Sequence, residues 1–109
     1  MHTPDPDAFS LDINDPADAE LIEYFLGELP ERVDAIEAAF SNDDYEALGR
    51  VAHQLKGAAP GFGFPAIGNE AGKLEQQISS ICDPTEEIEA IRSQVDSLVS
   101  LCNSFINPS

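Results

Sequence analysis

The segment His53–Ala59 (HQLKGAA) contains a histidine, a lysine three residues later and a glycine four residues later. If the segment is helical, these three positions lie on neighbouring turns of one surface. An imidazole is a nucleophile near neutral pH, and a lysine beside it neutralises the charge of an anionic group that the ring receives. A glycine next to the ring leaves room for a second protein to approach. Together these properties suit phosphoryl transfer through His53.

The helical pattern around His53 directs its side chain away from the core. At 100° per residue, His53 lies about 140° from Leu48, with Gly49 and Gly57 one turn before and after it. A glycine inside a helix costs about 1 kcal/mol relative to alanine, so two of them beside one histidine require a reason other than helix formation. We interpret them as bare backbone that gives another protein access to the ring. The apolar face of this helix consists of Leu48, Val51, Ala52, Leu55 and Ala59.

The chain of 109 residues is long enough for one domain with a single core, and its hydrophobic content of 42% indicates a folded globule. Its net charge of −16 argues against a nucleic-acid or anionic-membrane ligand and favours a protein partner. Residues 1–46 hold fourteen acids and one base, whereas residues 47–76 have a net charge of +1. The region around His53 is therefore the part of the chain that best tolerates an incoming phosphoryl group.

The sequence lacks the signals of membrane-spanning, secreted, disulfide-rich, di-iron and nucleotide-binding proteins. No run of about 18 apolar residues is present, and residues 1–7 do not resemble a signal peptide, so we expect a cytoplasmic protein. Cys82 and Cys102 have no CxxC spacing and are expected to be reduced and structural. A di-iron site is not expected, because the helical domain holds one histidine and no Glu-x-x-His pair. The sequence also has no glycine-rich nucleotide loop.

Residues 1–13 are interpreted as an N-terminal extension, and residues 14–107 as one helical domain. The first helix is predicted to begin with Asp15 as its N-cap and Pro16 at the first helical position. Pro30 interrupts the helical hydrogen bonding without changing the phase of the apolar stripe, so one kinked helix and two abutting helices both fit. The stripe consists of Ile22, Phe25, Leu26, Leu29, Val33, Ile36 and Phe40.

Three further helices are predicted in the rest of the domain. Asp43 and Glu46 form a capping box for the second helix, which ends at residues 61–63. Pro65 begins the third helix, and Asp83 caps the fourth. Four apolar stripes joined by short connections predict an all-α fold, an antiparallel four-helix bundle. The last two stripes are Ile67, Ala71, Leu74, Ile78 and Ile81, followed by Ile88, Ile91, Val95, Leu98, Cys102 and Phe105.

The segment from His53 to Gly63 resembles the histidine-containing phosphotransfer (HPt) domain family. The family motif is H-x-L/I-K-G-small-small followed by an aromatic or aliphatic residue and glycine, and the similarity covers nearly the whole domain. Residues 62–64 (FGF) are especially similar to the phosphotransfer domain of chemotaxis-type kinases. The resemblance implies a four-helix bundle in which His53 accepts a phosphoryl group from a receiver-domain aspartate or a kinase and passes it on.

The resemblance also implies roles for the neighbours of His53. A glutamate or glutamine at the position of Glu75, on the flank of the third helix, accepts a hydrogen bond from the ring nitrogen that does not carry the phosphoryl group. Lys56 would offset the phosphoryl charge, and Gly57 would supply clearance. The remaining binding candidates are Gly49, Gln54, Pro60, Phe62 and Phe64.

Some of these candidates have a structural interpretation as well. Pro60, Phe62 and Phe64 fit an apolar docking patch beside the site and fit equally well a core at the end of a helix. Gly68 and Gly72, four residues apart on the third helix, fit close helix packing. A solvated histidine without a function is the simplest reading of His53 alone, and the combination with lysine and glycine favours a site over it.

The expected molecule is a monomeric phosphocarrier and not an enzyme. Its partners would be a response-regulator receiver domain, a histidine kinase or both. It would need no cofactor of its own, and magnesium is expected on the receiver. The alternative is an acidic helical module that binds a receiver or kinase and regulates it by occlusion. Such a module would keep the docking face but would form no phosphohistidine.

Overall fold

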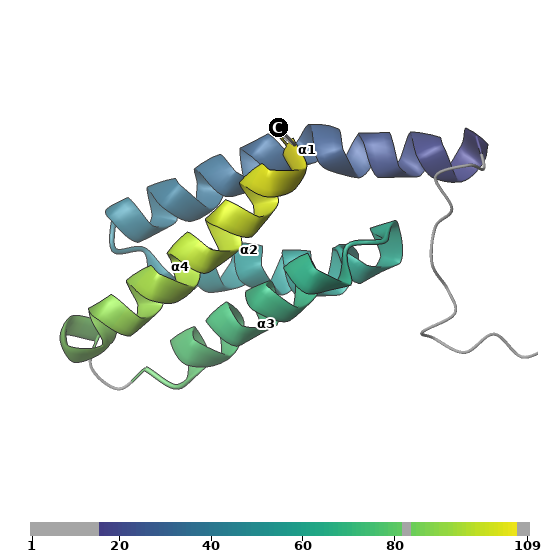
Figure 1. Cartoon of the computed structure of the whole chain (residues 1–109). Coiled ribbons are helices and arrows are strands. Elements are labelled where there is room, and N and C mark those ends of the chain that lie inside the picture. The colour runs from purple at the N-terminus through teal and green to yellow at the C-terminus, as the bar shows by residue number, and fades with distance from the viewer. Residues whose placement is uncertain (1–15, 82–83, 107–109) are drawn as a thin grey trace, which may run out of the picture.

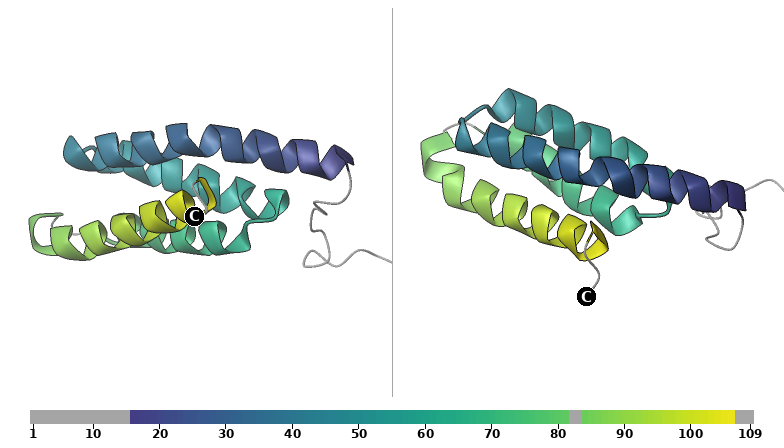
Figure 2. Two further views of the ribbon diagram at one scale, coloured as in Figure 1. Left: turned by 45° about the horizontal axis from the view of Figure 1, so that its top comes forward. Right: turned by 90° about the horizontal axis from the view of Figure 1, so that it is seen from above.

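The chain forms a bundle of four antiparallel helices in a computed structural model that describes residues 16–81 and 84–106 (Figure 1). Helix α1 packs on α2 and α4, and α3 packs on the same two helices, so the four surround one core. The expected all-α four-helix fold is confirmed. The first turns of α1 extend past the end of the bundle (Figure 2). The helices are α1 (Pro16–Ser41), α2 (Tyr45–Ala58), η2 (a 3₁₀ turn, Pro60–Phe62), α3 (Pro65–Ser79) and α4 (Pro84–Ile106).

Helix α1 is one continuous helix that contains Pro30. The proline lies on the exposed side of the helix, where the backbone carbonyl that loses its partner can reach solvent. The phase of the apolar stripe is therefore kept on both sides of it. The predicted N-cap, Asp15, and the predicted cap of the fourth helix, Asp83, lie outside the described residues, as does the N-terminal extension.

The start of α2 differs from the prediction. Asp44, not Asp43, is the N-cap, and its side chain accepts a hydrogen bond from the backbone N–H of Ala47 at 3.1 Å. Asp43 has a φ of 56°, the left-handed conformation that turns the chain out of α1, and an N-cap needs an extended backbone instead. The predicted N-cap is therefore one residue too early, and the predicted capping box between Asp43 and Glu46 is wrong, because Ala47 at the third helical position has no side chain that could bond back to the cap.

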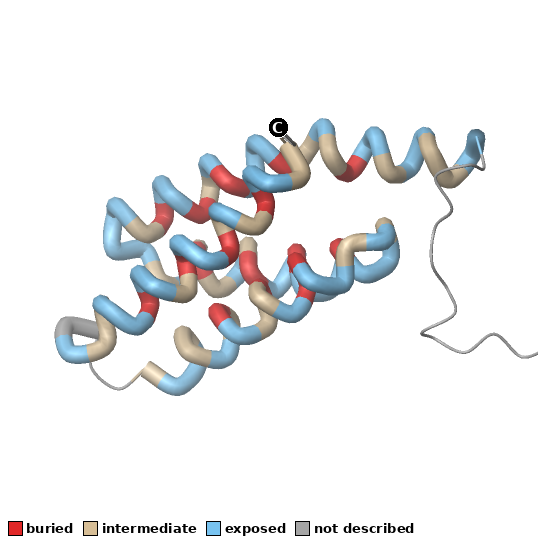
Figure 3. Tube along the Cα trace, in the orientation of Figure 1, coloured by how far each residue is buried: buried red, intermediate tan, exposed pale blue. Residues whose placement is uncertain are grey.

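The buried residues lie on the sides of the helices that face into the bundle (Figure 3), and none of those in the described part of the chain is polar or charged. Most of the predicted stripe residues are buried, and the others, such as Val51 and Phe40, are half-buried. Cys102 is a free, buried thiol whose pKa is raised to about 11 by desolvation, which agrees with a reduced, structural cysteine. Cys82 lies outside the described residues. The buried set is Phe25, Leu29, Val33, Ile36, Ala39, Leu48, Ala52, Leu55, Ala59, Ile67, Ala71, Leu74, Ile91, Val95, Leu98 and Cys102.

The turn from α2 to α3 brings these two helices close together. Gly63 has a φ of 93°, which glycine adopts without strain, and it reverses the chain after η2. The Pro60 ring then packs on Gly68 so tightly that a Cβ atom at Gly68 would lie 2.7 Å from Pro60 Cγ. The close-packing interpretation of Gly68 is confirmed. This contact fixes how α3 lies along α2, and thereby which α3 side chains face His53.

None of the helices in residues 16–81 and 84–106 is long and apolar enough to cross a lipid bilayer.

Candidate functional site

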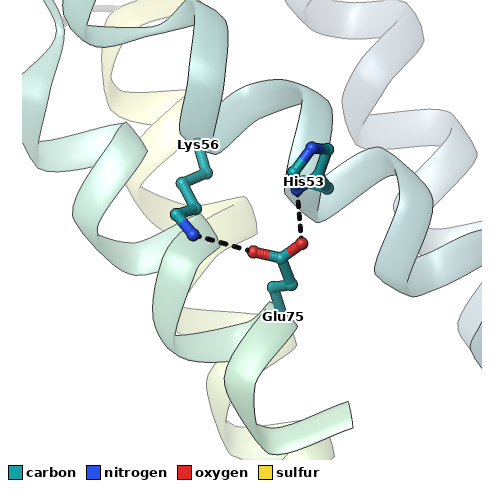
Figure 4. A network of polar contacts seen from close by, with 3 residues as sticks. All are labelled: His53, Lys56 and Glu75. Carbon is teal, nitrogen blue, oxygen red and sulfur yellow. Dashed lines mark hydrogen bonds and ion pairs between the residues drawn. The ribbon is translucent and has the colours of Figure 1, made fainter. Parts of the chain in front are cut away.

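His53 lies on the outer surface of α2, with 69% of its side chain exposed. This agrees with the orientation predicted from the helical angles. Its ring leans toward α3, where Glu75 approaches from the neighbouring helix (Figure 4). The side chain is thus open to solvent on one edge and held by the protein on the other.

Glu75 binds His53 and Lys56 with its two carboxylate oxygens. Oε2 lies 2.5 Å from His53 Nδ1, and Oε1 accepts from Lys56 Nζ at 3.1 Å (Figure 4). Because a carboxylate can only accept, Nδ1 must carry the proton in this contact. In a neutral ring the other nitrogen, Nε2, then has the free lone pair. The predicted approach of Glu75 to the imidazole is present in the structure.

The charge state of Glu75 follows from these contacts. The hydrogen bond from Lys56 lowers the pKa of the Glu75 carboxyl most, and the contact with His53 lowers it further. Desolvation raises the pKa and opposes both, but the direction of the whole shift is downward. Glu75 is therefore ionised at neutral pH and remains an acceptor for the Nδ1 proton.

Lys56 reaches Glu75 by crossing the surface of α3. Its alkyl chain runs over Gly72, where a Cβ atom would lie 3.5 Å from Lys56 Cδ, an ordinary van der Waals distance. The lysine stem thus packs on apolar surface while its ammonium group stays half-exposed beside the site. Gly72 was predicted to serve helix packing, and the side chain that packs on it is Lys56.

The two glycines of α2 have different surroundings. At Gly57 a Cβ atom would meet nothing within 4 Å, so the backbone there faces open space one turn after His53. At Gly49 a Cβ atom would lie 3.4 Å from Ile78 Cγ2 of α3. The interpretation of Gly49 as bare backbone for a second protein is therefore corrected, because this glycine accommodates the neighbouring helix.

The aromatic candidates pack mainly within the protein. Phe62 and Phe64 both stack on Phe25 of α1, with ring centroids 5.1 and 5.2 Å apart, and Phe64 also meets the edge of Phe105 at 4.9 Å. Both rings are half-buried. Pro60 packs on Gly68, as described above. Of the three docking candidates, Phe62 lines a surface groove.

This groove of about 330 Å³ lies between α1 and α2, directly beside the site. Gln54, the residue after His53, forms part of its wall, and Gln54 Oε1 accepts a hydrogen bond from Arg32 of α1 at 3.3 Å. Tyr24 stands next to Phe62 and is 62% exposed. The groove is lined by Tyr24, Phe25, Glu28, Arg32, Gln54, Leu55, Ala58 and Phe62.

Sequence reasoning missed Arg32 and Tyr24. Arg32 is the single base among residues 1–46, which was a usable signal, but its contact with Gln54 depends on the distance between two helices. Tyr24 precedes the buried Phe25 and had no signal of its own. In the described residues, no group of three His, Cys, Asp or Glu side chains comes together in a way that could hold a metal ion.

Comparisons with known proteins give one family match and one curated relative. The family model named Hpt domain matches residues 20–101. The phosphorelay intermediate protein YPD1 of Candida albicans is 28% identical over 87 residues, which cover 80% of this chain and 47% of that protein. The chain thus spans about half the length of this relative. No solved structure matches the chain significantly.

Proposed function

This chain belongs to the Hpt domain family, and from that premise we propose that it carries a phosphoryl group on His53 and exchanges it with the aspartate of a receiver domain. A role in phosphorelay histidine phosphotransfer accords with the family and with the name of the yeast relative. The observation that carries the assignment of His53 is its pairing with Glu75. An exposed imidazole whose Nδ1 proton is held by a carboxylate has a nucleophilic Nε2 directed to solvent.

The transfer step follows from this tautomer. The Nε2 lone pair attacks the phosphorus of an aspartyl phosphate, the N–P bond forms, and the P–O bond to the aspartate breaks. The electron pair of that bond leaves on the aspartate carboxylate. The ring gains positive charge while Nδ1 keeps its proton, and the ionised Glu75 stabilises that charge at 2.5 Å. In the reverse direction the same contact holds the ring in place while the phosphoryl group leaves.

Two neighbours of His53 assist this step in different ways. Lys56 places an ammonium group beside the ring as a point charge for the phosphoryl oxygens. Gly57 leaves the surface clear for the receiver, because its backbone faces open space. The exposed Tyr24 and the half-buried Phe62 provide apolar surface next to the site on which the receiver can dock.

The remaining parts of the reaction would come from the partner. Magnesium prefers a set of oxygen ligands, whereas the site offers an imidazole, an ammonium group and one carboxylate already used by both. We therefore assign the metal to the receiver and place no cofactor on this chain. It acts as a monomeric cytoplasmic phosphocarrier and has no kinase activity of its own.

The test is phosphate uptake by the wild-type chain and by His53→Gln from a phosphorylated receiver. We expect the wild type to gain a phosphate that is labile in acid and stable in base, and the variant to gain none. Uptake that survives in His53→Gln contradicts the assignment. A wild-type chain that binds the receiver without taking up phosphate would instead support a module that regulates by occlusion.

A further inference from the structure

Arg32 differs from the other basic residues of the chain in its ion pairing. Among residues 16–81 and 84–106, four of the five basic side chains form an ion pair with a carboxylate, and Arg32 forms none. Glu28 lies one turn before Arg32 and lines the same groove, but it is not within ion-pair distance. The four pairs are Arg50–Glu46 at 3.8 Å, Lys56–Glu75 at 3.1 Å, Lys73–Glu70 at 3.3 Å and Arg92–Glu89 at 3.8 Å.

The unpaired guanidinium reaches the residue that follows the proposed phosphoacceptor in the sequence. Arg32 crosses from α1 and donates to Gln54 Oε1, a neutral amide on the residue that follows His53. Although the chain has twenty-one acidic residues, this exposed arginine pairs with none of the carboxylates in the part of the chain that the structure describes. Its charge is available for another anion.

Arg32 and Lys56 lie on opposite flanks of His53. Lys56 belongs to the flank of α2 that faces α3, where it shares Glu75 with Nδ1 of the ring. Gln54 and Arg32 belong to the flank that faces α1. Figure 4 shows that the second ring nitrogen, Nε2, lies on the edge of the ring away from Glu75. A phosphoryl group on Nε2 is therefore added outside the Lys56–Glu75 pair.

The charge of the proposed site is already balanced before phosphorylation. Lys56 contributes one positive charge and Glu75 one negative charge to the group formed with a neutral His53. After transfer, the phosphoryl oxygens carry nearly two negative charges near neutral pH and the ring carries one positive charge, so the group is left with about one negative charge in excess. An arginine fork binds two phosphate oxygens at once and is weakly hydrated, so it suits this task better than a second lysine.

We propose that Arg32 is a second phosphoryl-binding residue, which exchanges Gln54 Oε1 for the phosphoryl oxygens when His53 is phosphorylated. This inference rests on the proposed function of His53 and adds a residue from α1 to the site. Gln54 is then a positioning residue that holds the guanidinium beside the ring in the unphosphorylated state.

The first test uses phosphoramidate, a small phosphodonor that needs no partner protein. His53 Nε2 attacks its phosphorus, the N–P bond to the ring forms, and the P–N bond of the donor breaks with loss of ammonia. We expect Arg32→Gln to lower the initial rate of His53 phosphorylation about tenfold, and Arg32→Lys to restore part of it. Arg32 is exposed, so both variants should fold, and circular dichroism checks this.

Arg50→Gln is the matched control. Arg50 stands one turn before His53 and its removal changes the net charge by the same amount, but it is paired with Glu46. We expect this variant to stay within about twofold of the wild type. Equal losses in the Arg32 and Arg50 variants would mean a general charge effect and would overturn the inference, as would an unchanged rate in Arg32→Gln.

The second test detects the contact itself. The chain has three arginines, so the side-chain Nε–H signals of ¹⁵N-labelled protein can be assigned with single variants. We expect phosphorylation to shift the Arg32 signal and to leave that of Arg50 in place. A wild-type chain that is phosphorylated without a shift at Arg32 overturns this inference alone. A wild-type chain that takes up no phosphate at all overturns the proposed function as well.

Discussion

Helix α3 carries two glutamates in similar surroundings, Glu70 and Glu75. Their side chains are 26% and 23% exposed, and each forms an ion pair with a lysine, at 3.3 Å for Glu70–Lys73 and 3.1 Å for Glu75–Lys56. Each also reaches a polar side chain on a neighbouring helix. The pKa of both carboxyls is lowered, for Glu70 chiefly by the hydrogen bond from Gln94 and for Glu75 chiefly by the one from Lys56.

The two glutamates differ in the kind of side chain that contacts them from the neighbouring helix. Gln94 Nε2 donates to Glu70 Oε2 at 2.6 Å and contacts its backbone carbonyl at 3.2 Å, so this amide ties α4 to α3. His53 contacts Glu75 through one ring nitrogen and keeps a second, on a side chain that is 69% exposed. The same kind of carboxylate contact thus joins two helices on one side of α3 and holds an exposed imidazole on the other.

The largest expected effect comes from removing each carboxylate in turn. Glu75→Ala should slow phosphoryl uptake by about tenfold to a hundredfold, because the ring loses the acceptor that fixes its tautomer and supports its charge. Glu70→Ala should leave uptake unchanged and cost about 1 kcal/mol of stability in chemical denaturation, through loss of the Gln94 contact. Similar losses of uptake in both variants would contradict the division of roles.

Lys56 and Lys73, which pair with these two glutamates, should also differ in their effect on phosphoryl uptake, but by less. Lys56→Ala should slow uptake about fivefold, the size expected for a half-exposed charge, without unfolding the bundle. Lys73→Ala removes the lysine of the Glu70 pair and should have no effect on the rate. Stopped-flow measurement of transfer from a phosphorylated receiver compares them, and an unchanged rate in Lys56→Ala would remove this residue from the site.

Gly57 allows stability and function to be separated. Gly57→Ala should raise the free energy of unfolding by about 1 kcal/mol, because alanine is the better helix former and its Cβ meets nothing within 4 Å. It should slow transfer from a receiver and leave uptake from phosphoramidate unchanged, since the small donor needs no clearance. Gly27→Ala, on the outer face of α1, is the control: it should gain stability without any loss of transfer. Full transfer activity in Gly57→Ala would show that the receiver does not approach there.

The smallest expected effect is on the pH dependence of stability. Because the pKa of Glu75 is lower in the folded chain than in the unfolded one, its contribution is present above the unfolded pKa and is lost as pH falls through the folded pKa. The stability of the wild type should therefore approach that of Glu75→Gln as the pH falls through this range. Denaturant titrations at a series of pH values measure it. A difference that is constant with pH would show that the carboxylate charge does not stabilise the fold.

The four helices were predictable from the sequence because helix signals are local. The three- and four-residue spacing of apolar side chains identified the buried faces, including Leu48 and Leu98, and Pro65 correctly opened the third helix. The cap of α2 was misplaced, because the choice between Asp43 and Asp44 depends on which residue takes the left-handed turn. The way α1 ends determines which aspartate becomes the N-cap, and the sequence pattern at the start of α2 does not.

The places of the candidate site residues on single helices were predictable, whereas most contacts between helices were not. His53, Lys56 and Gly57 follow from the spacing on α2, and Glu75 from its place on the flank of α3. The contacts of Gly49 with Ile78 and of Arg32 with Gln54 depend on how far apart neighbouring helices lie. That distance is set in part by the Pro60 ring on Gly68, a contact between residues that carry no side-chain chemistry.

The position of the phosphoryl group on the imidazole tests the account most directly. The chain has two histidines, His2 and His53, and each ring has two nitrogens, so ¹⁵N-histidine labelling with phosphorus-coupled NMR can distinguish all four positions. We predict one phosphohistidine, with the N–P bond at Nε2 of His53 and the proton retained at Nδ1. A phosphoryl group on Nδ1, the nitrogen that faces Glu75, or on any other residue would contradict the account.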